Sequence, residues 1–399
     1  MQHLIAPPAS SPAALTPTLE RRARTLARQI GRGLLGVLGL LVVLGLTGAI
    51  YESVAEAADM RAYPPPGRMI DVGGYRLHID CVGTGSPTVV IDAGWGDSSG
   101  AWSSSVQPGV ARTTRVCTYD RAGMGYSEPG PLSRTAERFA EELHTLLSGA
   151  DEPGPYVMVG HSLGGLPVRV FAHEYAAEVA GVVLIESMSP RQARPSTSAT
   201  PTETDSHSIA DWALTLPART GVLRLLAGAT DAVEGLSPEV ANYYSVFWAT
   251  PRSLQAWLDE GKGTSESLAQ AGAVHSFGAL PLIVLSRGLL VDPDPDWQRM
   301  QTELLELSSS SQQLFADKSG HSIEFDQPEA AVGAIEKMVE QARAQALAPV
   351  EGLWVDRVVG LDDVRQRVAM LRTPDAMAGS SLRSSTIRRR SPQSRKTHR

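Results

Sequence analysis

Cysteine and basic charge are both scarce in this sequence. Only Cys81 and Cys117 occur among the 399 residues, and neither they nor the nine histidines show the spacing of a zinc site. We therefore expect no structural metal and no cofactor. The formal net charge is −7, and because residues 350–399 hold 11 Lys/Arg against 5 Asp/Glu, the rest of the chain carries −13. Such an acidic body argues against nucleic acid as a partner.

The remaining composition is that of a globular protein. Hydrophobic residues make up 42% of the sequence and charged residues 20%, a balance typical of folded domains. A chain of 399 residues is long enough for one large domain or two ordinary ones.

Near the N-terminus, residues 33–51 form an uncharged apolar run that follows five arginines at positions 21–32. A helix of this length spans roughly the hydrocarbon core of a bilayer, at about 1.5 Å per residue. We therefore predict a cytoplasmic basic tail at 1–32, a transmembrane signal anchor at 33–51 and a helical stalk at 52–65. The arginines would hold the N-terminus in the cytoplasm and leave the rest of the chain outside it. A cleaved signal peptide, and thus a secreted protein, is the alternative.

Short apolar runs alternate with helix-like segments after residue 66. We expect strands at 68–72, 75–82, 87–92, 114–119, 156–159, 179–185, 280–286 and 313–316. Continuous apolar strands alternating with helices predict an α/β fold, with a mostly parallel sheet covered by helices on both faces. This core would occupy residues 66–186 and 280–345.

The alternation stops after Glu186. Residues 187–279 contain a Ser/Thr/Pro-rich loop and amphipathic patterns that predict helices at 217–226, 238–248, 251–259 and 265–271. An insertion of this size is too long for a plain loop, so we interpret it as a helical cap. Beyond the core we expect a further amphipathic helix or helix pair at 346–372 and a disordered basic tail at 373–399.

The chemical centre of the sequence is the segment Gly-His-Ser-Leu-Gly at 160–164. It follows an apolar run and precedes a helix-compatible segment at 166–175. Glycine at 160 and 164 removes side chains that would collide with neighbouring backbone in a tight strand-to-helix turn. Such a turn holds the Ser162 hydroxyl outside the sheet edge and aims the first helix amides at the group it attacks. We interpret Ser162 as a catalytic nucleophile.

Four motifs, in this order, resemble the α/β-hydrolase fold superfamily over about residues 66–345. They are Gly94-Trp95-Gly96, the Asp-Arg-Ala-Gly-Met-Gly-Tyr-Ser segment at 120–127, the elbow at 160–164, and Ser319-Gly320-His321. The resemblance implies that the cap is inserted after the sixth strand. It also implies a catalytic triad and an oxyanion hole formed by the backbone amides of Trp95 and Leu163.

A serine hydroxyl needs an adjacent base, and His321 is the best candidate. It follows the last predicted strand on a small Ser-Gly loop, at the sheet edge where site loops gather. Two residues compete as the acid that would orient His321. Asp292 follows the strand at 280–286 and is favoured, and Glu186 follows the strand at 179–185.

In this fold the strands that carry Cys81 and Cys117 would be neighbours. A disulfide is chemically open to them outside the cytoplasm. Bridges between adjacent strands are geometrically awkward, however, so we favour two buried thiols.

The predicted function is that of a membrane-anchored serine hydrolase, similar to carboxylesterases and lipases. It would cleave an ester or related acyl bond of a small-molecule substrate through an acyl-enzyme on Ser162. A catalytically silent binding protein of the same fold is one alternative, and a cofactor-free perhydrolase with the same triad is another. Haloalkane dehalogenases and epoxide hydrolases are disfavoured, because they normally carry a carboxylate at the position of Ser162.

Overall fold

The structure, a computed structural model, describes residues 17–131, 133–192, 207–227, 247–288 and 294–346. An eight-stranded sheet forms its centre, in the order β1-β2-β4-β3-β5-β6-β7-β8. β1 and β2 pair antiparallel, as do β2 and β4, and all other neighbours are parallel. The predicted mostly parallel α/β fold is confirmed. The strands are β1 Arg68–Asp71, β2 Arg76–Val82, β3 Thr88–Asp92, β4 Val116–Tyr119, β5 Tyr156–His161, β6 Val179–Ile185, β7 Leu282–Arg287 and β8 Ser311–Ala316.

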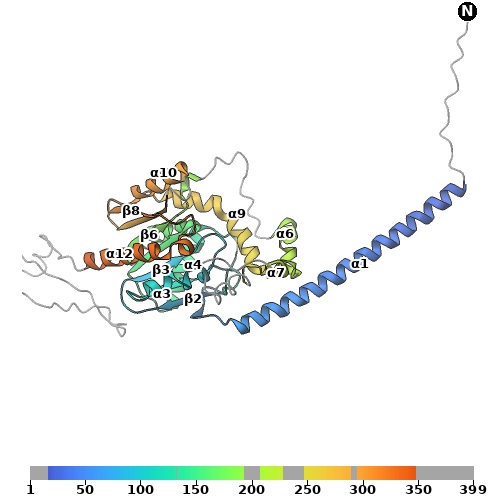
Figure 1. Cartoon of the computed structure of the whole chain (residues 1–399), viewed down its shortest axis with the longest axis horizontal. Helices are drawn as coiled ribbons and strands as arrows, with labels where there is room; N and C mark the ends of the chain where they lie inside the picture. Colours follow the sequence, from blue (N-terminus) through green and yellow to red (C-terminus); the bar gives the residue numbers. More distant parts are fainter. Residues whose placement is uncertain (1–16, 132, 193–206, 228–246, 289–293, 347–399) are drawn as a thin grey trace, which may run out of the picture.

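Helices cover both faces of this sheet (Figure 1). Alternate strand residues divide between two cores: Met158 packs with α4 and α5, whereas Val157 and Val159 pack with α2, α3 and α12. Every residue of β3, β4, β5 and β7 is buried, which explains their unbroken apolar character. The helices of the core are α2 Ser99–Ser103, α3 Val106–Val110, α4 Ala136–Gly149, α5 Gly165–Glu174, α10 Pro295–Glu303, α11 Ile323–Asp326 and α12 Pro328–Ala346, with short 3₁₀ turns η1 Ser162–Gly164, η2 Ala176–Glu178, η3 Pro190–Gln192 and η4 Leu304–Leu307.

The cap follows β6, as predicted, but its helix bounds differ from the expected ones. α6 spans Ile209–Arg219 and α7 spans Val222–Ala227, so Pro217 lies inside α6 rather than at the start of a helix. The helix begins earlier because Ser208 and Asp211 form a reciprocal capping box. The prediction of a helix starting at Pro217 was therefore wrong, and most of the helix predicted at 238–248 lies outside the described residues.

A single helix, α9 (Pro251–Ala273), replaces the two helices predicted at 251–259 and 265–271. Gly261 and Gly263 lie inside this helix, where the absence of a side chain allows neighbouring residues to pack closely. A Cβ on Gly263 would lie 1.9 Å from the Arg134 carbonyl oxygen, and one on Gly261 would lie 2.7 Å from the Trp95 ring. The helix thereby packs closely against Trp95 and Arg134. The segments expected at 346–372 and 373–399 lie outside the described residues, apart from residue 346.

The N-terminal helix α1 runs without interruption from Pro17 to Ala62. Among the described residues, its Arg24–Ala62 portion is the one stretch long and apolar enough to cross a membrane. None of its most apolar window is buried by the protein. The helix projects from the body, and α6 and α7 lie beside the end nearest to the core (Figure 1).

Cys81 and Cys117 are joined by a disulfide, so the expectation of two free thiols was wrong. The two residues lie directly opposite each other in the antiparallel β2–β4 pair, with their Cα atoms 4.0 Å apart. Directly opposite residues of an antiparallel pair bring their Cβ atoms close together, which is the condition that the prediction overlooked.

Candidate active site

Ser162 lies on a sharp turn between β5 and α5. Its φ angle is +50°, a left-handed conformation that non-glycine residues rarely adopt. The turn is tightly packed: a Cβ on Gly160 would lie 2.6 Å from the Gly164 carbonyl oxygen, and one on Gly164 would lie 2.4 Å from the Asp92 carbonyl oxygen. These contacts give the steric reason for glycine at both positions.

The ends of three sequence segments meet at this turn. The His321 Nε2 atom lies 3.0 Å from the Ser162 hydroxyl oxygen, within hydrogen-bonding distance. On its other side, the His321 Nδ1 atom lies 3.3 Å from a carboxylate oxygen of Glu186. Ser162 follows β5, Glu186 follows β6, and His321 follows β8. The hydroxyl, imidazole and carboxylate therefore form one continuous line of polar contacts.

Glu186 is completely buried and held from a second side by Arg287. The Arg287 backbone amide donates a hydrogen bond to Glu186 Oε1 at 2.7 Å, and its guanidinium lies 3.4 Å from Oε2. Glu186 also has a positive φ of 44°, so the chain bends at this residue and directs it away from the strand. A buried carboxylate with two donors and an imidazole is fixed in one orientation.

The other predicted acid, Asp292, lies outside the described residues. Two residues further on, Asp294 caps α10 by accepting hydrogen bonds from the Asp296 and Trp297 amides, both at 3.0 Å. Its side chain therefore starts a helix rather than contacting His321.

The two residues predicted to supply the oxyanion hole lie on different segments. Leu163 is the next residue along the turn and is buried. Trp95 lies in the loop after β3, where its ring stacks on Trp257 of α9 at 5.1 Å and its indole N–H donates to the Trp257 carbonyl at 2.8 Å. The cap helix thus holds the loop that carries Trp95.

The sequence analysis did not predict a buried network of ion pairs next to that loop. The Arg121 guanidinium pairs with Asp92 at 2.6 Å and with Glu260 of α9 at 2.7 Å, and it also donates to the carbonyls of Ala93 and Gly94. Glu260 in turn accepts the Gly96 amide at 2.9 Å. Arg121 belongs to the motif at 120–127, but no local signal marks Glu260, which lies 139 residues away along the chain.

Asp120, in the same motif, shapes the loop beside the site. Its carboxylate accepts the amides of Ser99 at 2.7 Å and Tyr126 at 3.0 Å, and it contacts His78 Nδ1 at 2.9 Å. Burial opposes ionisation of Asp120, but the His78 charge and these hydrogen bonds lower its pKa overall.

A second histidine and carboxyl lie behind the nucleophile. His161 is buried, its Nε2 atom is 3.1 Å from the His321 carbonyl oxygen, and it lies 3.6 Å from Glu324. Burial, with the nearby His321, lowers the pKa of His161 to about 3. Burial raises the pKa of Glu324 to about 7. Both groups are therefore held in their neutral forms at pH values below 7 and above 3.

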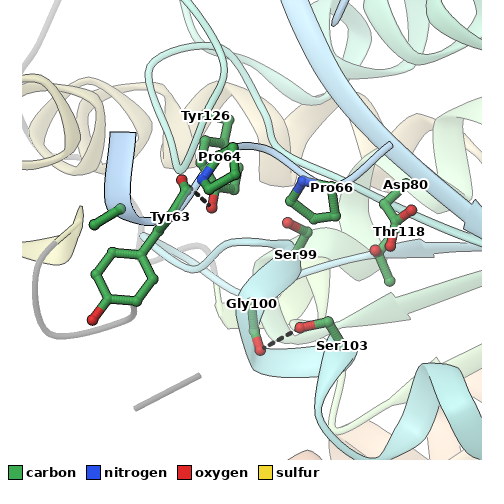
Figure 2. A pocket seen from close by; sticks show the side chains of 10 residues that line it. Tyr63, Pro64, Pro66, Asp80, Ser99, Gly100, Ser103, Thr118 and Tyr126 are labelled. Carbon is green, nitrogen blue, oxygen red and sulfur yellow. Dashed lines mark hydrogen bonds between the residues drawn. The ribbon is translucent and has the colours of Figure 1, made fainter. Parts of the chain in front are cut away.

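Two cavities lie elsewhere in the described residues. One, of about 290 Å³, is lined by the segment after α1 and by Asp80, Ser99 and Thr118 (Figure 2). Another, of about 340 Å³, lies between α1 and α9 and includes Arg134 and Arg252. Neither is lined by Ser162, Glu186 or His321.

Among the described residues, one cluster of side chains has the spacing of metal ligands, but its chemistry does not suit a metal site. Within the described residues, the one group of side chains with suitable spacing is Cys81, Cys117 and Glu152. Both sulfurs are bonded to each other, so neither offers a thiolate.

The sheet order, the strained serine turn and the cap inserted after β6 define an α/β hydrolase. The model of the alpha/beta hydrolase family matches residues 89–334, which is more than half of the chain. The chain belongs to this family.

Two relatives show the extent of sequence similarity. The chain is 28% identical over 249 residues to YqjL, an uncharacterised protein of Bacillus subtilis, and the match covers 62% of this chain and 81% of YqjL. It is also 30% identical over 131 residues to an uncharacterised vacuolar membrane protein of Saccharomyces cerevisiae, covering 28% of this chain but only 20% of that protein.

The solved structures with a similar fold include enzymes named for different activities. An epoxide hydrolase matches with a TM-score of 0.51 at 21% identity, over 68% of this chain and 97% of that one. An esterase from Thermogutta terrifontis matches with a TM-score of 0.50 at 22% identity, over 69% and 98%. A haloalkane dehalogenase loop variant from Bradyrhizobium elkanii matches with a TM-score of 0.52 at 19% identity, over 70% and 97%. At these identities the likeness describes the fold alone.

Proposed function

We propose that this protein is a serine hydrolase that cleaves an ester or related acyl bond through an acyl-enzyme on Ser162. The observation that carries the proposal is the line of contacts from the Ser162 hydroxyl to His321 Nε2 and from His321 Nδ1 to Glu186. An imidazole in this position can accept the hydroxyl proton while the carboxylate stabilises the resulting imidazolium.

The reaction follows from these contacts. As the Ser162 oxygen bonds to the substrate carbonyl carbon, its proton passes to His321 Nε2. The carbonyl oxygen becomes negatively charged, and the backbone amides of Trp95 and Leu163 would donate hydrogen bonds to it. Collapse of this intermediate breaks the ester bond, and His321 protonates the departing alkoxide. Water then attacks the acyl-enzyme while one of its protons passes to His321. As the bond to Ser162 breaks and the acid leaves, His321 returns this proton to the Ser162 oxygen.

Glu186 is the acid that we adopt, in place of the Asp292 favoured by sequence spacing. Its burial and its two contacts with Arg287 keep it fixed next to His321. A carboxylate that holds a histidine in one tautomer must itself be fixed in position, and these contacts fix Glu186.

We further propose that α1 anchors the enzyme in a membrane, with the catalytic body outside the cytoplasm. The five arginines at positions 21–32 favour a cytoplasmic N-terminus, and the Cys81–Cys117 disulfide favours an oxidising compartment for the body. The anchored chain should remain with membranes after a high-salt wash, whereas a cleaved and secreted form would be shorter and soluble.

Labelling with a fluorophosphonate probe tests the nucleophile. The wild type should be labelled, whereas Ser162→Ala and His321→Ala should not, because the probe reacts with an activated serine hydroxyl. An unlabelled wild type would contradict the proposal and favour a catalytically silent binding protein of the same fold.

Matched substitutions distinguish the two acids. Glu186→Gln keeps the shape of the side chain but loses the charge, and it should lower kcat for a nitrophenyl ester by about 10³- to 10⁴-fold. Asp292→Asn should have little effect on kcat. The reverse result would assign the acid to Asp292.

A further inference from the structure

The cap helix α6 has polar side chains on its inner face and apolar side chains on its outer face. Asp211 and Thr215 are buried, and Asp211 pairs with Lys262 of α9. Ile209 and Trp212, one helical turn apart, are exposed. A helix packed on a water-soluble body has the opposite arrangement.

The exposed apolar side chains continue onto α7. The set, which we call the cap apolar surface, is between 39% and 89% exposed and consists of Ile209, Trp212, Leu214, Leu216, Val222, Leu225 and Leu226. Outside α1, α6 and α7, the exposed large apolar side chains among the described residues are Trp95, Trp248 and Phe315. Apolar exposure is therefore concentrated at one place on the body, which is typical of an interaction surface.

This surface is attached to α1. A Cβ on Gly48 would lie 2.3 Å from the Thr220 carbonyl oxygen, and one on Gly221 would lie 2.7 Å from the Tyr51 ring, so the α6–α7 turn touches the helix. One turn further along, both oxygens of the buried Glu52 accept hydrogen bonds from Arg224 at 2.8 Å, and Arg224 also pairs with Asp59. The ion pairs hold α7 against α1, and Figure 1 shows the two helices side by side.

The position of these contacts along α1 shows where the α6–α7 turn lies relative to the apolar run. Residues 33–51 are uncharged and just long enough to cross the roughly 30 Å hydrocarbon core. Gly48 lies four residues before Glu52, the first charge after this run, which is about 6 Å at 1.5 Å per residue. The α6–α7 turn is therefore level with the last turn of the apolar run, at the boundary between hydrocarbon and headgroups.

We propose that the cap apolar surface lies in the outer interfacial layer of the bilayer that α1 crosses. Trp and Leu side chains on one face of a helix are those that bury in this layer. The occupant of the surface is then lipid, and the cap is the part of the body that touches the membrane. The inference rests on the proposed insertion of α1.

Depth-dependent quenching of a label tests the proposal on the full chain in phosphatidylcholine vesicles. Both native cysteines are bonded to each other, so a single introduced cysteine can be labelled alone. We would place the fluorophore NBD at Trp212→Cys and at Leu225→Cys, with Lys337→Cys on the exposed side of α12 as the control. Both cap labels should emit at shorter wavelength and be quenched by lipids with a doxyl group at acyl carbon 5, and the control should not.

Two results would overturn the inference. Cap labels that behave like the Lys337 control would mean that the surface lies in water. Cap labels that emit at shorter wavelength without quenching by lipid would mean that a protein, such as a second copy of this chain, covers the surface. If α1 does not insert at all, the whole chain leaves the vesicles in high salt, which separates failure of the anchor from failure of the cap surface.

A pair of substitutions within α1 tests how the cap is seated. Gly48→Leu should force the Thr220 carbonyl away from the helix and reduce quenching at position 212 by about half, because interfacial burial depends on seating the apolar face. Gly39→Leu adds the same side chain where nothing lies within 4 Å, and quenching should stay at the wild-type level. Equal quenching in both variants would overturn the claim that α1 positions the cap.

Discussion

Two residues at the site share a backbone conformation that costs free energy. Ser162 and Glu186 have φ angles of 50° and 44°, and each follows directly after a strand. Such conformations cost about 1–3 kcal/mol each and persist only where surrounding structure enforces them. Here the surrounding backbone packs against Gly160 and Gly164, and Arg287 holds Glu186. The strain turns both side chains out of their strands and toward His321.

Glu324 gives a pH-dependent prediction at the same scale. Burial raises its pKa in the folded protein from 4.5 to about 7, so folding favours the neutral carboxyl. The stability that this neutral form contributes is fully present below pH 4.5 and is lost as the pH rises through 7. Glu324→Gln cannot ionise. Its free energy of unfolding relative to the wild type should therefore rise by about 2–3 kcal/mol between pH 5 and pH 8.5.

Thermal or denaturant unfolding at these two pH values measures that difference. Glu329→Gln, an exposed carboxyl at the start of α12, is the matched control and should show no comparable rise. A constant difference between Glu324→Gln and the wild type across this range would contradict a buried neutral carboxyl.

At the scale of elements, one buried cation contributes to the connection between α9 and the loop after β3. Arg121→Met would leave the Asp92 and Glu260 carboxylates buried without their partner. The loss should be about 3–5 kcal/mol of unfolding free energy, because an uncompensated buried charge is strongly unfavourable. Denaturant unfolding in detergent micelles, followed by tryptophan fluorescence, measures it.

Arg76→Met is the control for that substitution. Arg76 also pairs with a carboxylate, Glu128, but the pair is solvent-exposed and should contribute little. Similar stability losses in the two variants would mean that the ion network does not connect α9 to the core.

The elements that sequence predicted well are those specified by their own residues. The strands at 179–185 and 68–72 were recognisable from local apolar pattern, and the turn at Ser162 from its glycines. The acidic residue of the triad was harder to predict, because the partner of His321 depends on where each strand ends in three dimensions. The ion pair between Arg121 and Glu260 joins residues 139 apart, and no local pattern encodes such a contact. In α9, glycines that normally end a helix instead admit close neighbours.

For the whole molecule, the disulfide ties the first part of the sheet together across 36 residues. Closing a loop of this length typically contributes about 2–4 kcal/mol, mainly by restricting the unfolded chain. Replacing both cysteines by serine should lower the melting temperature, and dithiothreitol should lower that of the wild type but not that of the variant. A wild type that reacts with maleimide without prior reduction would show that the bond is absent in the isolated protein.

The unbroken path of α1 from its apolar run to the body has a consequence for its length. Each residue of a helix turns everything beyond it by about 100° and advances it by about 1.5 Å. Gly48 meets the Thr220 carbonyl, and Glu52 meets Arg224, on one stripe of the helix. Two alanines inserted between Tyr51 and Glu52 would rotate the second contact by about 200° away from the first. The contacts at Gly48 and Glu52 therefore depend on the exact number of residues between them. A substitution of the exposed Ile50 should be tolerated more readily than an insertion or deletion between Gly48 and Glu52.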